Sequence, residues 1–258
     1  AADATSGVLA LTRDAFVEVL QYGARLSGSN EKLSTKFKPI LDLLTEASYW
    51  AKEAGRKQVT GEDVATAVKK RWDFEGRMRR RMQEGYWKDV FHVQTEGSAV
   101  GQTNALTVYG GDFGLPTRAT VVVQAGGSGV TGLDKNAGWS GPSYVKGLET
   151  LKSFLAFEFG QEKPLPFEVR VSKEQLYGGI DGDSSTSTNI YATLSALSKV
   201  PIKQSIAITG SADQFGNVQA IGGVNQKIEG FFDVLIAKLK AAGKELDGSH
   251  GVIIPATN

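Results

Sequence analysis

Two glycine-rich turns in this chain each lead into a helical pattern and could together carry hydrolytic chemistry. The first turn, residues 178–188, ends in serines and threonines, and the second, residues 222–227, ends in Lys227. After Ser184, apolar residues recur at helical spacing, namely Ile190, Leu194 and Leu197. A serine at such a helix N-terminus lies where free backbone N–H groups and the helix dipole favour negative charge. This position suits a nucleophile beside an oxyanion hole.

A serine nucleophile needs a base, and the chain offers only two histidines and no cysteine. His92 lies far upstream, and His250 lies in a Gly-Ser-His-Gly loop near the end. Neither has a convincing context for a Ser-His-Asp triad, although the two could meet a serine in space. The remaining option is a Ser-Lys dyad.

Lys227 is the best candidate for the lysine of such a dyad. It opens a helical pattern whose apolar face must be packed, with Ile228, Phe231, Phe232, Leu235 and Leu239. Burial there would lower the lysine pKa from its ordinary ~10.4. Spacing alone leaves Lys199 and Lys203 open as bases, and Ser185 and Ser187 open as nucleophiles.

Three stretches closely resemble the Lon proteases of the B-type and C-type branches. They are residues 174–185 (EQLYGGIDGDSS), 207–211 (AITGS) and 216–229 (GNVQAIGGVNQKIE). In that family the nucleophile is the serine after Gly-Asp, which falls on Ser184, and the general base is the lysine that falls on Lys227. The two are 43 residues apart, which is the family spacing. The resemblance therefore implies a serine endopeptidase that works through an acyl-enzyme.

The resemblance also assigns supporting residues. It places Thr209 close to the dyad, hydrogen-bonded to its lysine, although Thr209 could also be a threonine that merely ends a strand. The backbone N–H groups of Asp183 and Ser184 would hold the oxyanion. Asp181 and Asp183 are interpreted as residues that shape the turn, because a glycine separates them, rather than as general bases.

The helical and strand patterns predict an α+β fold with two domains. Residues 1–92 resemble the helical lid domain of AAA+ ATPases, with Thr12 and Thr60 as helix N-caps. Residues 93–258 alternate short β-like runs with glycine turns and resemble the Lon-type proteolytic domain. In that family the chain continues beyond the strand at residues 252–254, so we expect the C-terminal end to be truncated.

Composition sets limits on partners and location. A chain of 258 residues with a net charge of +1 is not expected to bind nucleic acid specifically. The basic run from Arg77 to Arg81 is interpreted as a solvated helix face, paired with Asp73, Glu75 and Glu84. The absence of cysteine, of a signal peptide and of a long apolar run favours the cytoplasm and no membrane segment.

The sequence contains no Walker A motif, so we expect no cofactor and no metal in this chain. ATP and Mg²⁺ would be involved only if an ATPase core precedes it. The family resemblance implies unfolded or loosely folded protein substrates and a homo-oligomeric ring, most simply a hexamer. The competing hypothesis is a non-catalytic assembly module of a Lon-like protein, against which the intact Ser184, Lys227 and Thr209 argue.

Overall fold

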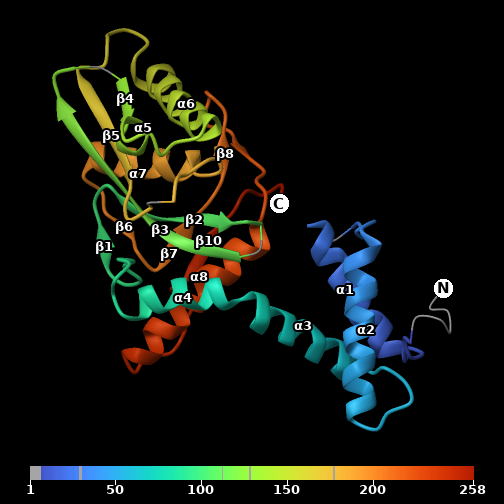
Figure 1. The fold of residues 1–258 in the computed structure, drawn as a ribbon. Coiled ribbons are helices and arrows are strands. Elements are labelled where there is room, and N and C mark those ends of the chain that lie inside the picture. Colours follow the sequence, from blue (N-terminus) through green and yellow to red (C-terminus); the bar gives the residue numbers. More distant parts are fainter. Residues whose placement is uncertain (1–6, 29–30, 112, 128, 177) are drawn as a thin grey trace. The chain divides into compact units, whose positions relative to one another are not determined.

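A computed structural model describes residues 7–28, 31–111, 113–127, 129–176 and 178–258 (Figure 1). For residues 73–75 it describes the backbone but not the side chains. The fold is mixed, 44% helical and 20% strand, which confirms the α+β prediction. It divides into two compact units, Ala1–Arg81 and Met82–Asn258. Each is described by itself below.

The first unit is helical. It contains α1 (Arg13–Ser27), α2 (Phe37–Glu53) and α3 (Gly61–Glu75), and α4 (Arg77–Trp87) begins in it. Both predicted caps are confirmed: the Thr12 side chain accepts the N–H of Ala15, and Thr60 forms a capping box with Asp63. The buried faces of the helices meet in one apolar core that includes Val19, Leu43, Ala47, Val59, Val64 and Ala67.

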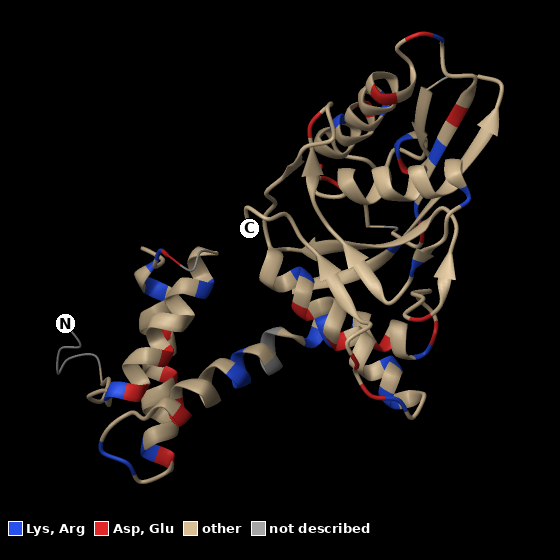
Figure 2. Ribbon diagram, turned by 180° about the vertical axis from the view of Figure 1, so that it is seen from behind, with Lys and Arg blue, Asp and Glu red and all other residues tan. Residues whose placement is uncertain are grey.

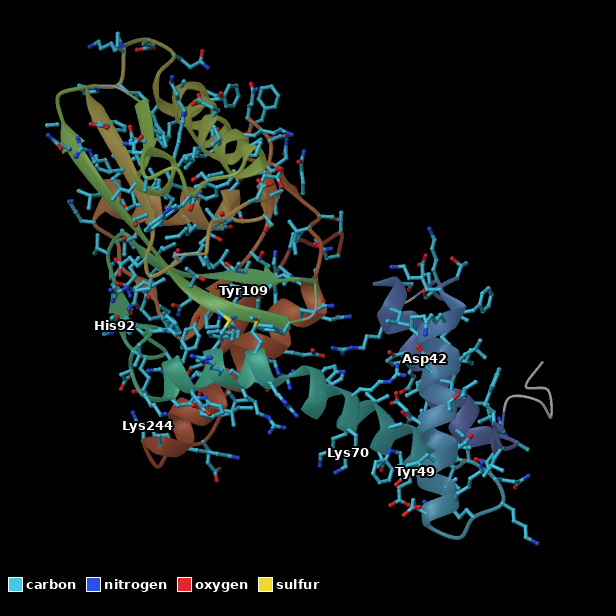
Figure 3. All side chains as sticks on the ribbon, viewed as in Figure 1. Asp42, Tyr49, Lys70, His92, Tyr109 and Lys244 are labelled. Carbon is cyan, nitrogen blue, oxygen red and sulfur yellow. The ribbon has the colours of Figure 1, made fainter. Side chains whose placement is uncertain are left out.

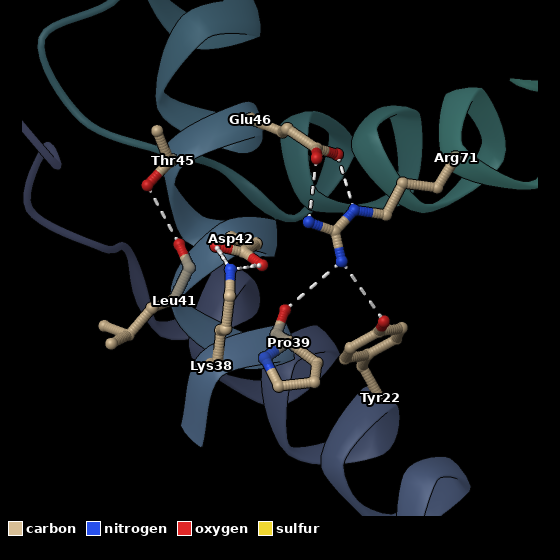
Figure 4. Close-up of polar contacts among 8 residues, drawn as sticks. All are labelled: Tyr22, Lys38, Pro39, Leu41, Asp42, Thr45, Glu46 and Arg71. Atoms are coloured by element: carbon tan, nitrogen blue, oxygen red, sulfur yellow. Dashed lines mark hydrogen bonds and ion pairs between the residues drawn. The ribbon is translucent and has the colours of Figure 1, made fainter. Parts of the chain in front are cut away.

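One arginine on α3 ties the three helices together (Figure 4). The Arg71 guanidinium donates two hydrogen bonds of 2.7 Å to the Glu46 carboxylate on α2. It also donates to the Tyr22 hydroxyl on α1 at 3.3 Å and to the Pro39 carbonyl at 3.2 Å. A planar guanidinium can reach all of these acceptors at once, so this partly buried residue fixes the helix packing.

The second unit is built on a six-stranded sheet in the order β10-β7-β2-β3-β5-β4 (Figure 1). Three long strands, β2 (Gln102–Tyr109), β3 (Phe113–Ala125) and β5 (Phe167–Lys173), run antiparallel in its centre. The shorter strands β4 (Gly129–Gly132), β7 (Ile206–Ile208) and β10 (Gly251–Ile253) pair in parallel. Two small ribbons join β1 (Ser98–Ala99) to β6 (Ile202–Lys203) and β8 (Ser211–Ala212) to β9 (Val218–Gln219).

Helices α6 (Pro142–Phe159) and α7 (Thr186–Ser198) share one core with β3 and β5, and the short α5 (Leu133–Asn136) precedes α6. This core contains Val121, Tyr144, Leu151, Phe154, Val169, Val171 and Ile190. Helix α8 (Val224–Ala241) packs against β2 and β3, and its Phe231 and Leu235 meet Leu106 and Ala207. Helix α7, which follows Ser184, and helix α8, which carries Lys227, are therefore both packed on the sheet.

The boundary between the compact units lies before Met82, whereas we expected a domain boundary after residue 92. Tyr86 and Val93 form a buried cluster with Leu115 and Val234, so residues 82–92 pack with the second unit. In the basic run, Arg79 lies 5.1 Å above the Trp72 ring. The side chains of Asp73 and Glu75, two of the partners expected for the basic run, are not among those that the structure describes. Figure 2 shows acidic and basic residues interspersed along both units.

No helix in the described ranges combines the length and apolar character needed to span a membrane.

Candidate active site

The Ser184 turn is held by backbone hydrogen bonds to Gly210, which lies between β7 and β8. Gly179 and Gly182 have φ angles of 83° and 105°, which allow the chain to reverse before α7. The Ser184 carbonyl accepts the N–H of Gly210 at 2.8 Å, and Ser187 N–H donates to the Gly210 carbonyl at 3.0 Å. Ser184 thus sits one residue before the helix N-cap, Ser185, as the glycine-rich pattern predicts.

Lys227 lies in the first turn of α8, and two glycines determine how closely that turn approaches the sheet. A Cβ on Gly230 would lie 1.7 Å from the carbonyl oxygen of Gly114 on β3, and a Cβ on Gly114 would lie 2.3 Å from the carbonyl oxygen of Gln226. Only glycine at both positions allows this backbone contact. This close packing of α8 on β3 places Lys227 beside the Ser184 turn.

The two turns bring Ser184 and Lys227 together. Lys227 Nζ lies 2.9 Å from Ser184 Oγ and 3.1 Å from Thr209 Oγ1. Thr209 Oγ1 in turn donates to the Ser184 carbonyl at 3.1 Å. The Thr209 side chain is therefore hydrogen-bonded to both residues of the dyad, and it is fixed by its own N–H, which donates to the Ile253 carbonyl of β10 at 3.0 Å.

Burial decides the protonation of Lys227. Its side chain is 3% exposed, and removal from water lowers the lysine pKa to about 8, while the negative charge of Asp183 opposes this shift. Near neutral pH an appreciable fraction of the amine is then uncharged and able to accept a proton.

The two carboxylates of the turn have structural partners. Asp181 Oδ1 accepts the N–H groups of Ser143, Tyr144 and Gly182 at 2.8, 3.2 and 2.9 Å, so it caps the start of α6. Hydrogen bonding to Gly182 is the main cause that holds the Asp181 pKa below its ordinary value. Asp183 Oδ2 accepts the Ser211 hydroxyl at 3.0 Å.

Two protein families match successive parts of the chain. The family described as the archaeal LonB AAA+ ATPase lid domain matches residues 10–73, and the Lon protease (S16) C-terminal proteolytic domain matches residues 177–242. The chain belongs to the Lon protease family. A Lon protease homologue of Escherichia coli (strain K12) is 36% identical over 95% of the chain and 41% of its own length.

Two further relatives lie at lower coverage or identity. A Lon protease homologue of Haemophilus influenzae is 38% identical over 72% of the chain and 32% of its own length. The archaeal Lon protease of Thermococcus kodakarensis is 27% identical over 88% of the chain and 36% of its own length. The chain therefore spans about a third to two fifths of the length of these relatives.

The dyad of this Lon-type domain opens onto a cavity of about 340 Å³. Its apolar lining comes mainly from β2, with Ala105, Leu106 and Val108, and from Ile180. One wall is the segment 220–222, which is clamped by Asn258: the Asn258 carboxamide accepts Ile221 N–H at 2.9 Å and donates to the Ile221 carbonyl at 2.8 Å. A peptide strand placed in this cavity would meet both dyad residues.

The alternative bases do not line this cavity. His92 lies exposed on the loop after α4 (Figure 3), and its backbone N–H donates to Gln175 Oε1 at 2.7 Å. His250 Nδ1 lies 3.0 Å from the Asp247 carboxylate. Lys199 ends α7 and Lys203 lies on β6, and both are exposed.

Sequence reasoning missed a second buried lysine in this Lon-type site. Lys173, at the end of β5, is 2% exposed and lines the same cavity as Ser184. Its Nζ donates to Asn189 Oδ1 on α7 at 2.7 Å. The alternation of the strand around Val169 and Val171 indicates an inward-facing residue 173, although lysine is rarely buried.

Within the described ranges, no group of three or more His, Asp and Glu side chains is arranged to hold a metal ion.

Proposed function

We propose that the second unit is a serine endopeptidase that uses Ser184 as nucleophile and Lys227 as general base. The observation that carries this proposal is the 2.9 Å contact between Lys227 Nζ and Ser184 Oγ, in a buried site that lowers the lysine pKa to about 8. A lysine that is partly neutral near physiological pH can accept the serine proton, which a solvated lysine cannot. The Lon family membership supports the same chemistry.

The proposed reaction proceeds in two stages. Neutral Lys227 takes the Ser184 proton while Oγ attacks the peptide carbonyl, and the resulting oxyanion is held by backbone N–H groups of Asp183 and Ser184 beside α7. Lys227 then gives the proton to the departing amine, which leaves Ser184 acylated. A water molecule, deprotonated by Lys227, attacks the ester carbonyl; the bond between the acyl carbon and Ser184 Oγ breaks, the acid is released, and Lys227 returns the proton to Oγ. Every group in these steps belongs to the chain, so we propose that cleavage of unstructured peptides needs neither metal nor ATP.

We propose unfolded or loosely folded proteins as substrates and a homo-oligomeric ring, most simply a hexamer, as the working state. Aromatic side chains on the second unit support a subunit contact, since Phe215 is 61% exposed and its ring lies 5.1 Å from that of Phe157. Sedimentation that finds only monomer at high concentration would contradict the ring. We propose the cytoplasm as the compartment, supported by a chain without cysteine.

Ser184→Ala tests the enzyme directly. The variant should lose hydrolysis of an unfolded protein such as casein and adduct formation with a peptide boronate, while its circular dichroism stays that of the native chain. Ser185→Ala tests the alternative nucleophile: it should still form the boronate adduct, because Ser184 remains in place. Undiminished hydrolysis by Ser184→Ala, or a wild-type chain that neither cleaves nor binds the boronate, would instead favour a non-catalytic assembly module.

A further inference from the structure

Two buried polar side chains in the active-site cavity are not accounted for by the dyad. Ser185 is 7% exposed, lines the cavity, and its Oγ has no hydrogen-bond partner among the described residues. Lys173 is 2% exposed and lines the same cavity. A buried hydroxyl without a partner costs stability, so it is retained where a ligand or water completes it.

Lys173 and Ser185 are brought together by α7. Asn189, which accepts the Lys173 Nζ hydrogen bond, follows Ser185 by one helical turn, and its N–H donates to the Ser185 carbonyl at 3.0 Å. Residues four apart lie on the same face of a helix. Lys173 Nζ is therefore held over the face of α7 that also presents Ser185.

The Lys173 amine has more N–H donors than the one acceptor found for it among the described residues. A lysine amine carries at least two N–H bonds, and Asn189 Oδ1 is the acceptor found for it in the described part of the chain. Asp134 also faces Lys173, but its Oδ2 accepts the backbone N–H of Lys173 at 3.0 Å. Burial lowers the pKa of Lys173 to about 7, with Asp134 opposing the shift, so the group serves as a donor in both its charged and its neutral form.

We propose that Lys173 and Ser185 form a polar subsite, next to Ser184, that binds a substrate side chain ending in a carbonyl oxygen, either a carboxamide or a carboxylate. The oxygen accepts a hydrogen bond from Lys173 Nζ and a second from the Ser185 hydroxyl. This inference rests on the proposed peptidase function and adds to it a preference for Asn, Gln, Asp or Glu at one position beside the scissile bond.

The physical basis of the preference is the cost of leaving these groups unpaired. An aliphatic side chain in the same place would displace water from Lys173 and Ser185 and offer no acceptor in return. A site built to hydrogen-bond its substrate rejects an analogue that lacks the polar atom more strongly than an apolar site rejects a change of size. The carboxylates of Asp181 and Asp183, which line the same cavity, disfavour an acidic side chain relative to a carboxamide.

The first experiment determines which substrate residue, counted from the scissile bond, enters the subsite. An unfolded protein is digested with the wild-type chain and the products are sequenced by mass spectrometry. We expect Asn, Gln, Asp and Glu to be enriched at one position relative to the cleaved bonds. Three peptides that differ only there, with Leu, Asn or Asp, then separate the contributions, because these side chains have nearly the same shape. Wild type should cleave the Asn or Asp peptide with a kcat/KM at least about tenfold above that of the Leu peptide.

In Lys173→Met, kcat/KM for the Asn or Asp peptide should be within about twofold of that for the Leu peptide. Ser185→Ala should lower the wild-type ratio of these two values by a smaller factor. The matched surface variant Lys199→Met should keep the wild-type ratio. If Lys173→Met fails to fold by circular dichroism, Ser185→Ala decides. Preference of the wild type for Leu, or an unchanged ratio in both site variants, overturns the subsite and leaves the peptidase intact. A wild-type chain that cleaves nothing overturns the proposed function, and the subsite with it.

Discussion

The hydroxyl of Thr209 donates its hydrogen to the backbone carbonyl of Ser184, with an oxygen–oxygen distance of 3.1 Å. With its hydrogen committed, the hydroxyl presents only lone pairs to Lys227 Nζ, which lies 3.1 Å away. A neutral amine that donates one N–H to Thr209 has its own lone pair free for the Ser184 proton. Thr209 is thus placed to orient Lys227, the proposed base, rather than to react.

Thr209→Val should lower kcat by about tenfold to a hundredfold, because it removes the group that orients the Lys227 lone pair and changes little in shape. KM for a short peptide should change much less, since Thr209 is not expected to contact substrate. Steady-state kinetics with circular dichroism measure both. Thr209→Ser keeps the hydroxyl and is the control, and full activity in Thr209→Val would remove Thr209 from this role.

The activity of the wild type should rise with pH along a limb set by Lys227. With a pKa of about 8, the lysine is mostly protonated below pH 7, so kcat/KM should fall about tenfold for each pH unit there and level off above pH 9. Lys227→Arg should be as inactive as Lys227→Met, because the guanidinium keeps its proton. A limb centred near pH 6.5, or activity in Lys227→Arg, would point to a different base.

Gly230→Ala tests the backbone contact that places Lys227. The added methyl group would overlap the Gly114 carbonyl, so α8 must move away from β3 and carry Lys227 from Ser184. We expect a loss of about 1–3 kcal/mol in the free energy of unfolding by urea. Peptidase activity should fall further than the unfolded fraction explains. Lys240→Ala, on the exposed face of the same helix, should change neither quantity appreciably.

Lys173→Met should alter the pH dependence of stability. The folded pKa of Lys173 is about 7, against about 10.4 in the unfolded chain, so the unfolded state binds more protons between these values. Wild-type stability gains from this group as pH rises from about 7 toward 10, and the methionine variant has no such gain. The free energy of unfolding of the variant minus that of wild type should therefore be larger at pH 7 than at pH 9.5.

Urea unfolding of both chains at the two pH values measures this difference. Lys199→Met is exposed and should show no comparable change between them. A constant difference for Lys173→Met would mean that Lys173 titrates in the folded chain as it does in water.

The elements that sequence predicts well are those set by local patterns. Thr12 and Thr60 cap helices as expected, and the glycine turns lead into α7 and α8 where the apolar spacing begins. By contrast, β9 pairs only at Val218–Gln219, and Ile221 is hydrogen-bonded to Asn258, a contact that no local pattern indicates.

What sequence could not reveal depends on contacts between distant segments. The cavity beside Lys227 is lined in part by Leu106 and Val108 of β2, more than a hundred residues upstream. The capping of α6 by Asp181 and the burial of Lys173 beside Asn189 also arise only from tertiary packing.

On the proposed mechanism, the close backbone contact between Gly114 and Gly230 makes peptidase activity depend on the packing of α8 against β3. Ser184 is hydrogen-bonded to Gly210, after β7, whereas Lys227 is placed beside it by the packing of α8 on β3. Separation of α8 from β3 would return Lys227 to water and to its ordinary pKa, and would leave Ser184 without the proposed base. On the proposed mechanism, we therefore expect a domain in which α8 is not packed against β3 to have no peptidase activity toward other proteins.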